Sequence, residues 1–308
     1  MKKIKFIFLI SALFLIGCDD DDLLSGNEES PGNTEFISEM KPGGVWLKMD
    51  NGMAIGTSYI DYYYASTTTF VLKNHVPYFK NIEYNGSFSV LVDEEEIYKC
   101  AVRSMLSSFI PDGANYMNIP YNQIYIIPIS FVLSSPDNGN NIPDLRNDIR
   151  IVEALKKYGQ YYEGLNFDFQ SVGQSSGKMV ITGELYNPDA IDYYYLDPEK
   201  MSMEFFHYVT NGLTLYDFKG NNFKIYTHKI KSDSWESLNK KWMSLIKSGE
   251  RKKISISYSN FDKVPPGNYK AYFNFPGLTY QMKQNEIEQA DGRIWIGEIS
   301  ASKDVIIE

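Results

Sequence analysis

Apolar and polar residues alternate in short runs along most of the chain after residue 44. A period of two is typical of strands, because successive side chains of a strand point to opposite faces. Turn residues separate many of the runs, among them Asn85-Gly86, Asn211-Gly212 and Pro265-Pro266-Gly267. The pattern predicts a mainly β fold in which short antiparallel strands build β-sandwich (Ig-like) domains. The expected strands are residues 45–49, 53–64, 68–72, 88–92, 96–105, 123–133, 178–186, 203–209, 213–218, 223–230, 253–258, 269–275 and 293–299.

Two segments have the spacing of helices instead, and we expect both helices to lie on the surface of a sheet. Asp144 can cap the start of the first segment and Gly159 its end. The apolar side chains of this segment recur at intervals of three or four: Leu145, Ile149, Val152, Leu155 and Tyr158. The second segment begins with Asp233 and Glu236 at capping-box spacing. One face of the second helix would carry Trp235, Leu238, Trp242, Leu245 and Ile246.

One short motif occurs twice in the chain. Ile60-Asp61-Tyr62-Tyr63-Tyr64 returns as Ile191-Asp192-Tyr193-Tyr194-Tyr195, 131 positions later. A separation of this size fits two similar domains. We therefore expect one β-sandwich domain over residues 41–165 and a second over residues 170–308, each with a short helix.

The first 17 residues have the layout of a secretion signal. Lys2, Lys3 and Lys5 precede an apolar run over residues 6–16, and the run stops at Gly17-Cys18. The run has about eleven residues, whereas a membrane-spanning helix needs about twenty. The pattern predicts that residues 1–17 are a signal peptide that is cut from the mature protein.

The sequence Leu15-Ile16-Gly17-Cys18 resembles the lipobox of bacterial lipoproteins. The resemblance implies that Cys18 receives a diacylglyceryl group and that its new amino terminus receives a further acyl chain such as palmitate. Several acyl chains give lasting attachment to a lipid bilayer.

The acidic run at residues 19–22 resembles the surface-export signal of Bacteroidota-type lipoproteins; an ordinary polar spacer is the alternative. The first interpretation implies a lipid-anchored protein of the outer membrane or cell surface, outside the cytoplasm. The tract over residues 18–40 is polar and lacks apolar periodicity. We expect it to be a flexible acidic tether.

Charge and cysteine content exclude some classes of function. The formal net charge is −9, and no cluster of Lys and Arg of the kind that follows phosphates is present, so nucleic acid is not an expected partner. With Cys18 lipidated, Cys100 is the remaining cysteine and no internal disulfide can form. We expect Cys100 to be a small buried hydrophobic residue, since a catalytic thiol would require a His partner.

The sequence motif of a serine-hydrolase nucleophile elbow occurs at Gly173-Gln174-Ser175-Ser176-Gly177. The elbow needs a helix after the serine, whereas residues 178–186 have the pattern of a strand, so a hairpin or linker loop is expected. The histidines His75, His207 and His228 have no ligand spacing, and the Asx-rich stretch at residues 137–144 does not fit an EF-hand. No metal and no cofactor are expected.

Two groups of carboxylates could supply a catalytic pair: the glutamates at residues 94–96, and Asp189 with Asp192. Either group could act in this way only if its carboxylates converge in a cleft. The pattern by itself favours solvated turns at these positions. No catalytic residue is therefore assigned from the sequence.

The tyrosine clusters are the strongest candidates for ligand binding. A tyrosine ring can stack on the apolar face of a sugar while a neighbouring carboxylate holds its hydroxyls; core packing is the alternative explanation. In a strand, Tyr62 and Tyr64 would share one face and Tyr63 the other. The candidate contact residues are Asp61, Tyr62, Tyr63, Tyr64, Asp192, Tyr193, Tyr194 and Tyr195.

In architecture and lipobox the chain resembles the surface lipoproteins of Bacteroidota that accompany polysaccharide uptake or cell-surface adhesion. The resemblance implies a non-enzymatic binding or adhesion module, with extracellular glycans or surface proteins as partners. Two alternatives stay open. The first is a structural or assembly subunit of a surface protein complex, and the second is an extracellular hydrolase.

Overall fold

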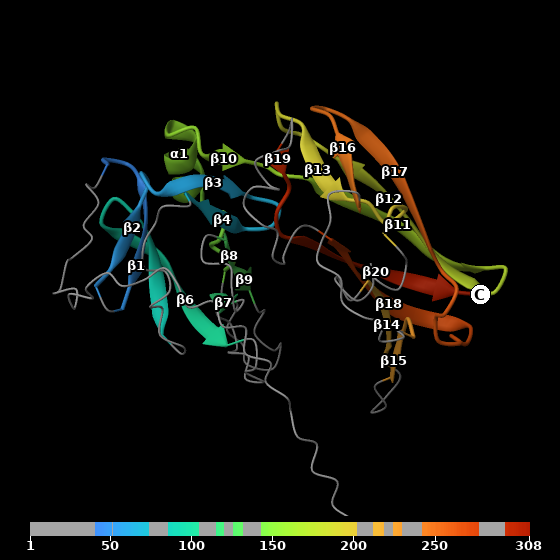
Figure 1. Ribbon diagram of the computed structural model, residues 1–308. Coiled ribbons are helices and arrows are strands. Elements are labelled where there is room, and N and C mark those ends of the chain that lie inside the picture. The colour runs from blue at the N-terminus through green and yellow to red at the C-terminus, as the bar shows by residue number, and fades with distance from the viewer. Residues whose placement is uncertain are drawn as a thin grey trace, which may run out of the picture. The chain divides into compact units, whose positions relative to one another are not determined.

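The structure of the protein is a computed structural model, shown in Figure 1. It describes residues 41–50, 52–73, 86–104, 115–119, 126–131, 143–201, 212–218, 224–229, 242–276 and 293–308. Over these residues the chain is mainly β, with several antiparallel sheets, and this confirms the fold class predicted from the alternation. The described part contains one helix, α1 (Ile149–Lys157).

Residues 45–162 contribute two sheets. The first has the strand order β2-β1-β5-β6-β7-β9 and the second has the order β10-β3-β4-β8. All neighbouring strands are antiparallel except β6 with β7 and β10 with β3. The bounds are β1 (Val45–Met49), β2 (Ala54–Gly56), β3 (Ile60–Tyr64), β4 (Thr69–Leu72), β5 (Ser87–Val92), β6 (Glu95–Ser104), β7 (Asn115–Ile119), β8 (Ile126–Pro128), β9 (Ser130–Phe131) and β10 (Tyr161–Tyr162).

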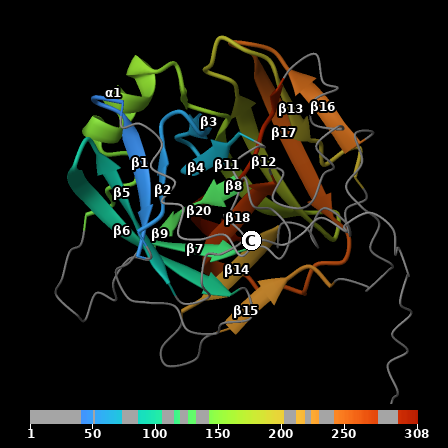
Figure 2. The ribbon, with the colours of Figure 1, turned by 60° about the vertical axis from the view of Figure 1, so that its left-hand side comes forward.

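The helix α1 lies beside β1 and β5 (Figure 2). Its end agrees with the prediction, because Gly159 follows it with a φ of 66°, a left-handed conformation that glycine adopts at low cost. Its predicted start was wrong, because Asp148 rather than Asp144 caps it and accepts a hydrogen bond from the backbone N–H of Arg150. Asp144 instead binds the side chain and backbone N–H of Arg146, which holds the preceding residues in a turn.

The second predicted helix is wrong where the structure describes it. Residues 230–241 lie outside the described ranges, and Met243–Ile246 form strand β16. This strand pairs antiparallel with β13 (Tyr193–Leu196), in the register Tyr193 with Ile246 and Leu196 with Met243. Met243 and Ile246, at the two ends of β16, are buried, so tertiary packing decides between two periodicities that the short segment allows.

Residues 166–307 contribute three further sheets. Their strand orders are β11-β12-β17, β16-β13-β19 and β15-β14-β18-β20. Figure 1 shows β20, β18, β14 and β15 side by side in this order. The bounds are β11 (Asn166–Ser175), β12 (Lys178–Tyr186), β14 (Leu213–Asp217), β15 (Lys224–Thr227), β17 (Arg251–Tyr258), β18 (Gly267–Pro276), β19 (Arg293–Ile294) and β20 (Glu298–Ile307).

An aromatic contact joins two of these sheets. The ring of Phe167 in β11 lies 5.3 Å from the ring of Phe273 and 5.0 Å from the ring of Phe275, both in β18. All three rings are buried. Sheets that bury their inner faces against each other in this way form a sandwich-type core.

The buried apolar side chains fall into two clusters. The first takes its members from Val45 to Leu155. The second runs from Leu165 to Ile307 and also includes Tyr62, Tyr64, Val71 and Ile126. Residues Phe36–Glu308 form one unit by their contacts, and β11 begins at Asn166, where a gap between domains was expected. The division into domains at 41–165 and 170–308 stays a prediction.

None of the described helical residues forms a segment long and apolar enough to cross a membrane. Cys18 and residues 1–40 lie outside the described ranges. Lipidation of Cys18 and the tether therefore stay predictions.

Candidate functional site

The first tyrosine cluster is buried on both faces of β3. Tyr62 and Tyr64 belong to the second core cluster, whereas Tyr63 belongs to the first, as the strand alternation predicts. Tyr63 donates hydrogen bonds to the carbonyl oxygen of Arg146 (3.0 Å) and to Oδ1 of Asn147 (2.8 Å). Asp61 is exposed. The rings of β3 are therefore core residues and present no face to solvent.

The second cluster is mostly buried as well. Tyr193 and Tyr195 are in the core, and the hydroxyl of Tyr193 donates to Oδ2 of Asp189 at 2.7 Å. Tyr194 and Asp192 are half-buried, and Asp192 accepts a hydrogen bond from the backbone N–H of Ser248 at 2.9 Å. Five of the six candidate rings thus follow the core-packing alternative, because a buried ring cannot stack on an external sugar without opening the core.

The glycine-flanked serines lie in a hairpin. Strands β11 and β12 pair antiparallel up to Ser175 with Lys178, and Ser176 and Gly177 form the turn with φ of 50° and 75°. No helix follows, so the expected hairpin is confirmed and the elbow geometry is not formed. His228 is buried, while His75 and His207 lie outside the described residues.

The remaining candidate groups have structural partners. Cys100 is buried, and this burial raises the pKa of its thiol well above the usual value. Asp189 accepts hydrogen bonds from the backbone N–H groups of Glu163 (3.0 Å) and Gly164 (2.8 Å). Glu95 pairs with Arg150, and Glu96 accepts from the hydroxyl of Ser89. Within the described ranges, no three His, Cys, Asp or Glu side chains are grouped so as to hold a metal ion.

A different set of aromatic side chains is exposed, on the outer face of the β15-β14-β18-β20 sheet. We call Tyr216, Phe218, Tyr272 and Ile225 the aromatic patch. The exposed fractions are 59% for Phe218, 43% for Tyr272 and 47% for Ile225. The rings of Tyr216 and Phe218 are stacked with centroids 6.0 Å apart, and Tyr216 meets Tyr272 edge to face at 5.0 Å. The exposed rings of Phe218 and Tyr272 are therefore joined into one surface by the half-buried ring of Tyr216.

The strand register explains why these side chains meet. Tyr216 in β14 lies opposite Ile225 in β15 and Lys270 in β18, and Thr214 lies opposite Tyr272. Directly opposed residues in a sheet share a face, and residues two apart in a strand share it too. The opposite face of β14 carries Leu213 and Leu215, which are fully buried in the core. Because the two leucines are buried, the side chains of Tyr216 and Phe218 point toward solvent.

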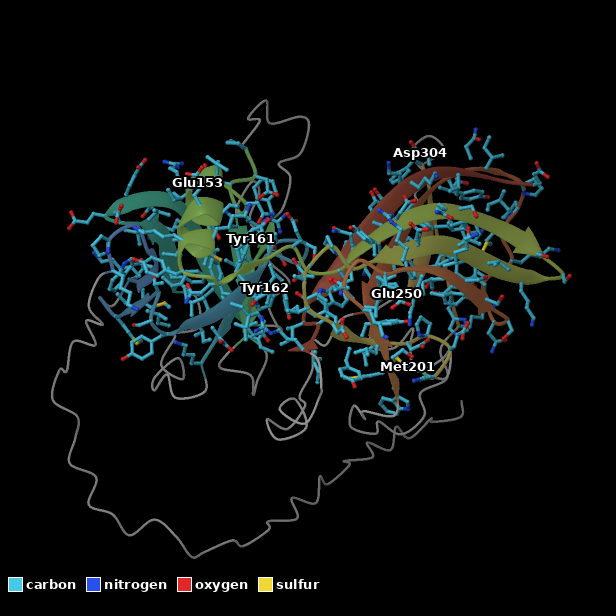
Figure 3. All side chains as sticks on the ribbon, turned by 90° about the horizontal axis from the view of Figure 1, so that it is seen from above. Glu153, Tyr161, Tyr162, Met201, Glu250 and Asp304 are labelled. Carbon is cyan, nitrogen blue, oxygen red and sulfur yellow. The ribbon has the colours of Figure 1, made fainter. Side chains whose placement is uncertain are left out.

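Polar groups border the aromatic patch on the same face of the sheet. The ammonium group of Lys270 lies 3.2 Å from the carboxylate of Asp304, which Figure 3 labels on β20. Ser302 lies opposite Tyr272 in the register of β18 and β20. Apolar rings thus lie beside hydroxyl, ammonium and carboxylate groups. This combination can hold a ligand that itself has an apolar face and several hydroxyls.

The aromatic patch was not among the candidate sites predicted from the sequence. Its signal was present in the alternation, because Tyr216 and Phe218 are spaced by two and are out of phase with Leu213 and Leu215. The contribution of Tyr272 depends on the pairing of β14 with β18, across more than fifty residues of sequence. No local pattern carries that information.

The protein-family models and the curated proteins give no match to this sequence.

Proposed function

We propose that the protein is a lipid-anchored surface lipoprotein that binds extracellular glycans without turning them over, through the aromatic patch. The observation that carries the proposal is the contact of Tyr216, Phe218 and Tyr272 on an exposed sheet face. Single exposed apolar residues are ordinary, but a contiguous exposed group is costly in water and typically marks a site of interaction. Anchorage is supported by the lipobox at residues 15–18.

A carbohydrate suits the chemistry of the patch. One face of a pyranose ring is lined by C–H groups and can cover an aromatic ring, while its hydroxyls need donors and acceptors nearby. The patch offers rings together with Lys270, Asp304 and Ser302. A tyrosine contributes both an apolar ring and a hydroxyl. These features support glycan recognition over a purely apolar ligand.

The alternative of an assembly subunit would use either the same patch or an open strand edge. Strand β17 forms the edge of the β11-β12-β17 sheet, and it carries Arg251, Lys252 and Lys253 at its start. Basic residues on an edge strand disfavour addition of another strand. A hydrolase would need a directed pair of carboxylates, whereas Asp189 and Asp192 accept backbone N–H groups. Both considerations favour a binding module.

The test is native affinity electrophoresis of the purified protein in gels that contain starch, xylan or mannan. We expect retardation in at least one gel. Phe218→Ala and Tyr272→Ala should abolish it while shifting the thermal midpoint by only a degree or two, because both side chains are exposed.

The matched control is Ile306→Ala on the same sheet. Ile306 is 72% exposed and lies opposite Asn268, outside the group of contacting rings. This variant should be retarded like the wild type. Absence of retardation in every gel, or retardation unaffected by both ring substitutions, would overturn the proposal. Loss of a protein partner in pull-downs by the same substitutions would instead favour the assembly alternative.

A further inference from the structure

Arg293 has unusual surroundings between two tyrosine rings. Its guanidinium carbon lies 4.1 Å from the ring centroid of Tyr62 and 4.5 Å from that of Tyr162. The two rings are perpendicular, with centroids 6.2 Å apart. Tyr162 belongs to β10 and is labelled in Figure 3, while Arg293 begins β19. The guanidinium group is therefore fixed by aromatic faces from strands far apart in sequence.

The backbone also holds Arg293 in place. Its N–H donates to the carbonyl oxygen of Asp192 at 3.0 Å, and Arg293 pairs with Tyr193 in the parallel ladder of β13 and β19. Arg293 and Tyr162 are both half-buried residues. A guanidinium group that is held in a fixed position can recognise planar anions.

Three other arginines of the described residues each form an ion pair with a carboxylate. Arg146 pairs with Asp144 at 2.7 Å, and Arg150 pairs with Asp148 at 2.8 Å. Arg251 is the closest parallel, because its guanidinium carbon lies 3.9 Å from the ring centroid of Tyr186 and its Nη1 lies 2.7 Å from a carboxylate oxygen of Glu184. The guanidinium group of each of these three arginines therefore has a carboxylate partner.

Arg293 packs between aromatic rings, as Arg251 packs on one, but it has no carboxylate partner within the described part of the chain. None of the ion pairs between described residues involves Arg293, and its Nη1 is buried without a hydrogen-bond acceptor. A buried donor of a charged group that makes no hydrogen bond costs free energy, because it has lost its water and gained nothing in return. A ligand that brings an acceptor to this position would recover that free energy.

We infer that Arg293, between Tyr62 and Tyr162, binds the carboxylate of a small acidic ligand, such as a uronic acid. A carboxylate matches the planar fork of a guanidinium group and can accept two parallel N–H bonds. It carries a single negative charge, which suits a protein of net charge −9 better than a polyanion does. The inference does not depend on the aromatic patch or on its proposed function.

The experiment follows the arginine side-chain N–H signals by NMR, together with the thermal midpoint, during titration with sodium D-glucuronate. Sodium chloride at equal ionic strength controls for salt, D-glucose controls for the sugar ring, and sodium sulfate tests for a tetrahedral anion. We expect glucuronate to shift one arginine signal and raise the midpoint, with no such effect of chloride or glucose. An equal effect of sulfate would overturn the assignment of a carboxylate.

Arg293→Met should abolish both responses, and Arg251→Met is the matched control, since Arg251 also lies on a tyrosine ring but has its own carboxylate. Arg251→Met should respond like the wild type. If Arg293→Met does not fold, Arg293→Lys keeps the charge and should bind about tenfold more weakly, because it loses the paired N–H donors. No response in the wild type, or an undiminished response in the Arg293 variants, would overturn the inference. Arg293→Met should leave retardation in polysaccharide gels unchanged, so this site and the aromatic patch can fail independently.

Discussion

The ring of Tyr64 in β3 contacts the ring of Tyr193 in β13, with centroids 5.6 Å apart and ring planes at 78°. Both rings are fully buried. The two tyrosine motifs, which are 131 positions apart in the sequence, therefore meet inside one core cluster. Each motif also lies on a strand with one parallel and one antiparallel neighbour: β3 between β10 and β4, and β13 between β19 and β16. The repeated motif thus has a repeated structural environment.

Replacement of Tyr64 by Ala should lower the free energy of unfolding by about 3–5 kcal/mol, because a buried aromatic ring leaves a cavity. Its ring also meets those of Tyr62 and Tyr162, so the cavity would disturb several neighbours. Asp61→Ala is the control on the same strand and should change the value by less than about 0.5 kcal/mol, since Asp61 is exposed. Urea unfolding measures both, and similar midpoints for the two variants would contradict the assignment of Tyr64 to the core.

Substitution of Asp189 should also lower the free energy of unfolding strongly. Its carboxylate accepts from two backbone N–H groups, of Glu163 and Gly164, and from the hydroxyl of Tyr193. Asp189→Ala leaves these donors without their acceptor. We expect the free energy of unfolding, measured in urea, to fall by about 2–4 kcal/mol.

Tyr193→Phe removes only one of the three hydrogen bonds to Asp189 and serves as the graded control. It should cost about 1 kcal/mol. A loss for Asp189→Ala no larger than the loss for Tyr193→Phe would show that the backbone contacts contribute little.

Glu298 should make stability depend on pH. Burial raises the pKa of its carboxyl from the usual 4.5 to about 7. Between these two values the folded protein binds more protons at this site than the unfolded chain does, so the contribution of Glu298 to stability falls as pH rises from about 4.5 to 7 and is constant above that. We expect a loss of about 1–3 kcal/mol across this window. Glu298→Gln, which cannot ionise, should remove this component from unfolding curves measured between pH 4.5 and 8, and an unchanged pH profile in the variant would contradict it.

Cys18→Ser should give a protein that no longer partitions into the detergent phase. The reason is the lipobox-like sequence at residues 15–18, in which the thiol of Cys18 is the expected site of acylation. Metabolic labelling with a fatty-acid probe checks this directly. The wild type should be labelled and the variant should not. A wild type without label would contradict the lipoprotein assignment.

The sequence predicted the secondary structure best where periodicity was unambiguous. Strand β12 and the end of α1 at Gly159 agree with the structure, because alternation and a left-handed glycine are local signals. The start of α1 was misplaced because Asp144 and Asp148 are both acceptable caps, and only the contact of Asp144 with Arg146 distinguishes them. Met243–Ile246 were misassigned to a helix because the ladder with β13 is a non-local interaction.

The candidate site was harder to predict than the fold. The sequence drew attention to the densest tyrosine runs, but a strand that is buried on both faces is rich in aromatic residues for reasons of packing, as Tyr63 and Tyr64 show. The exposed rings come from strands that are separate in sequence and that the register brings together, as Tyr216 and Tyr272 show. The environment of Arg293 likewise requires three strands to be placed in space.

The hairpin that joins β11 and β12 offers a position for site-specific labelling. Ser176 at its tip is exposed, and a side chain added at the neighbouring Gly177 would meet no atom within 4 Å. If Cys18 is acylated as predicted, a thiol introduced by Ser176→Cys would be the first to react with a maleimide dye, because Cys100 is buried. The fluorescence of that dye on vesicle-bound protein would report how far this end of the hairpin extends from the membrane surface.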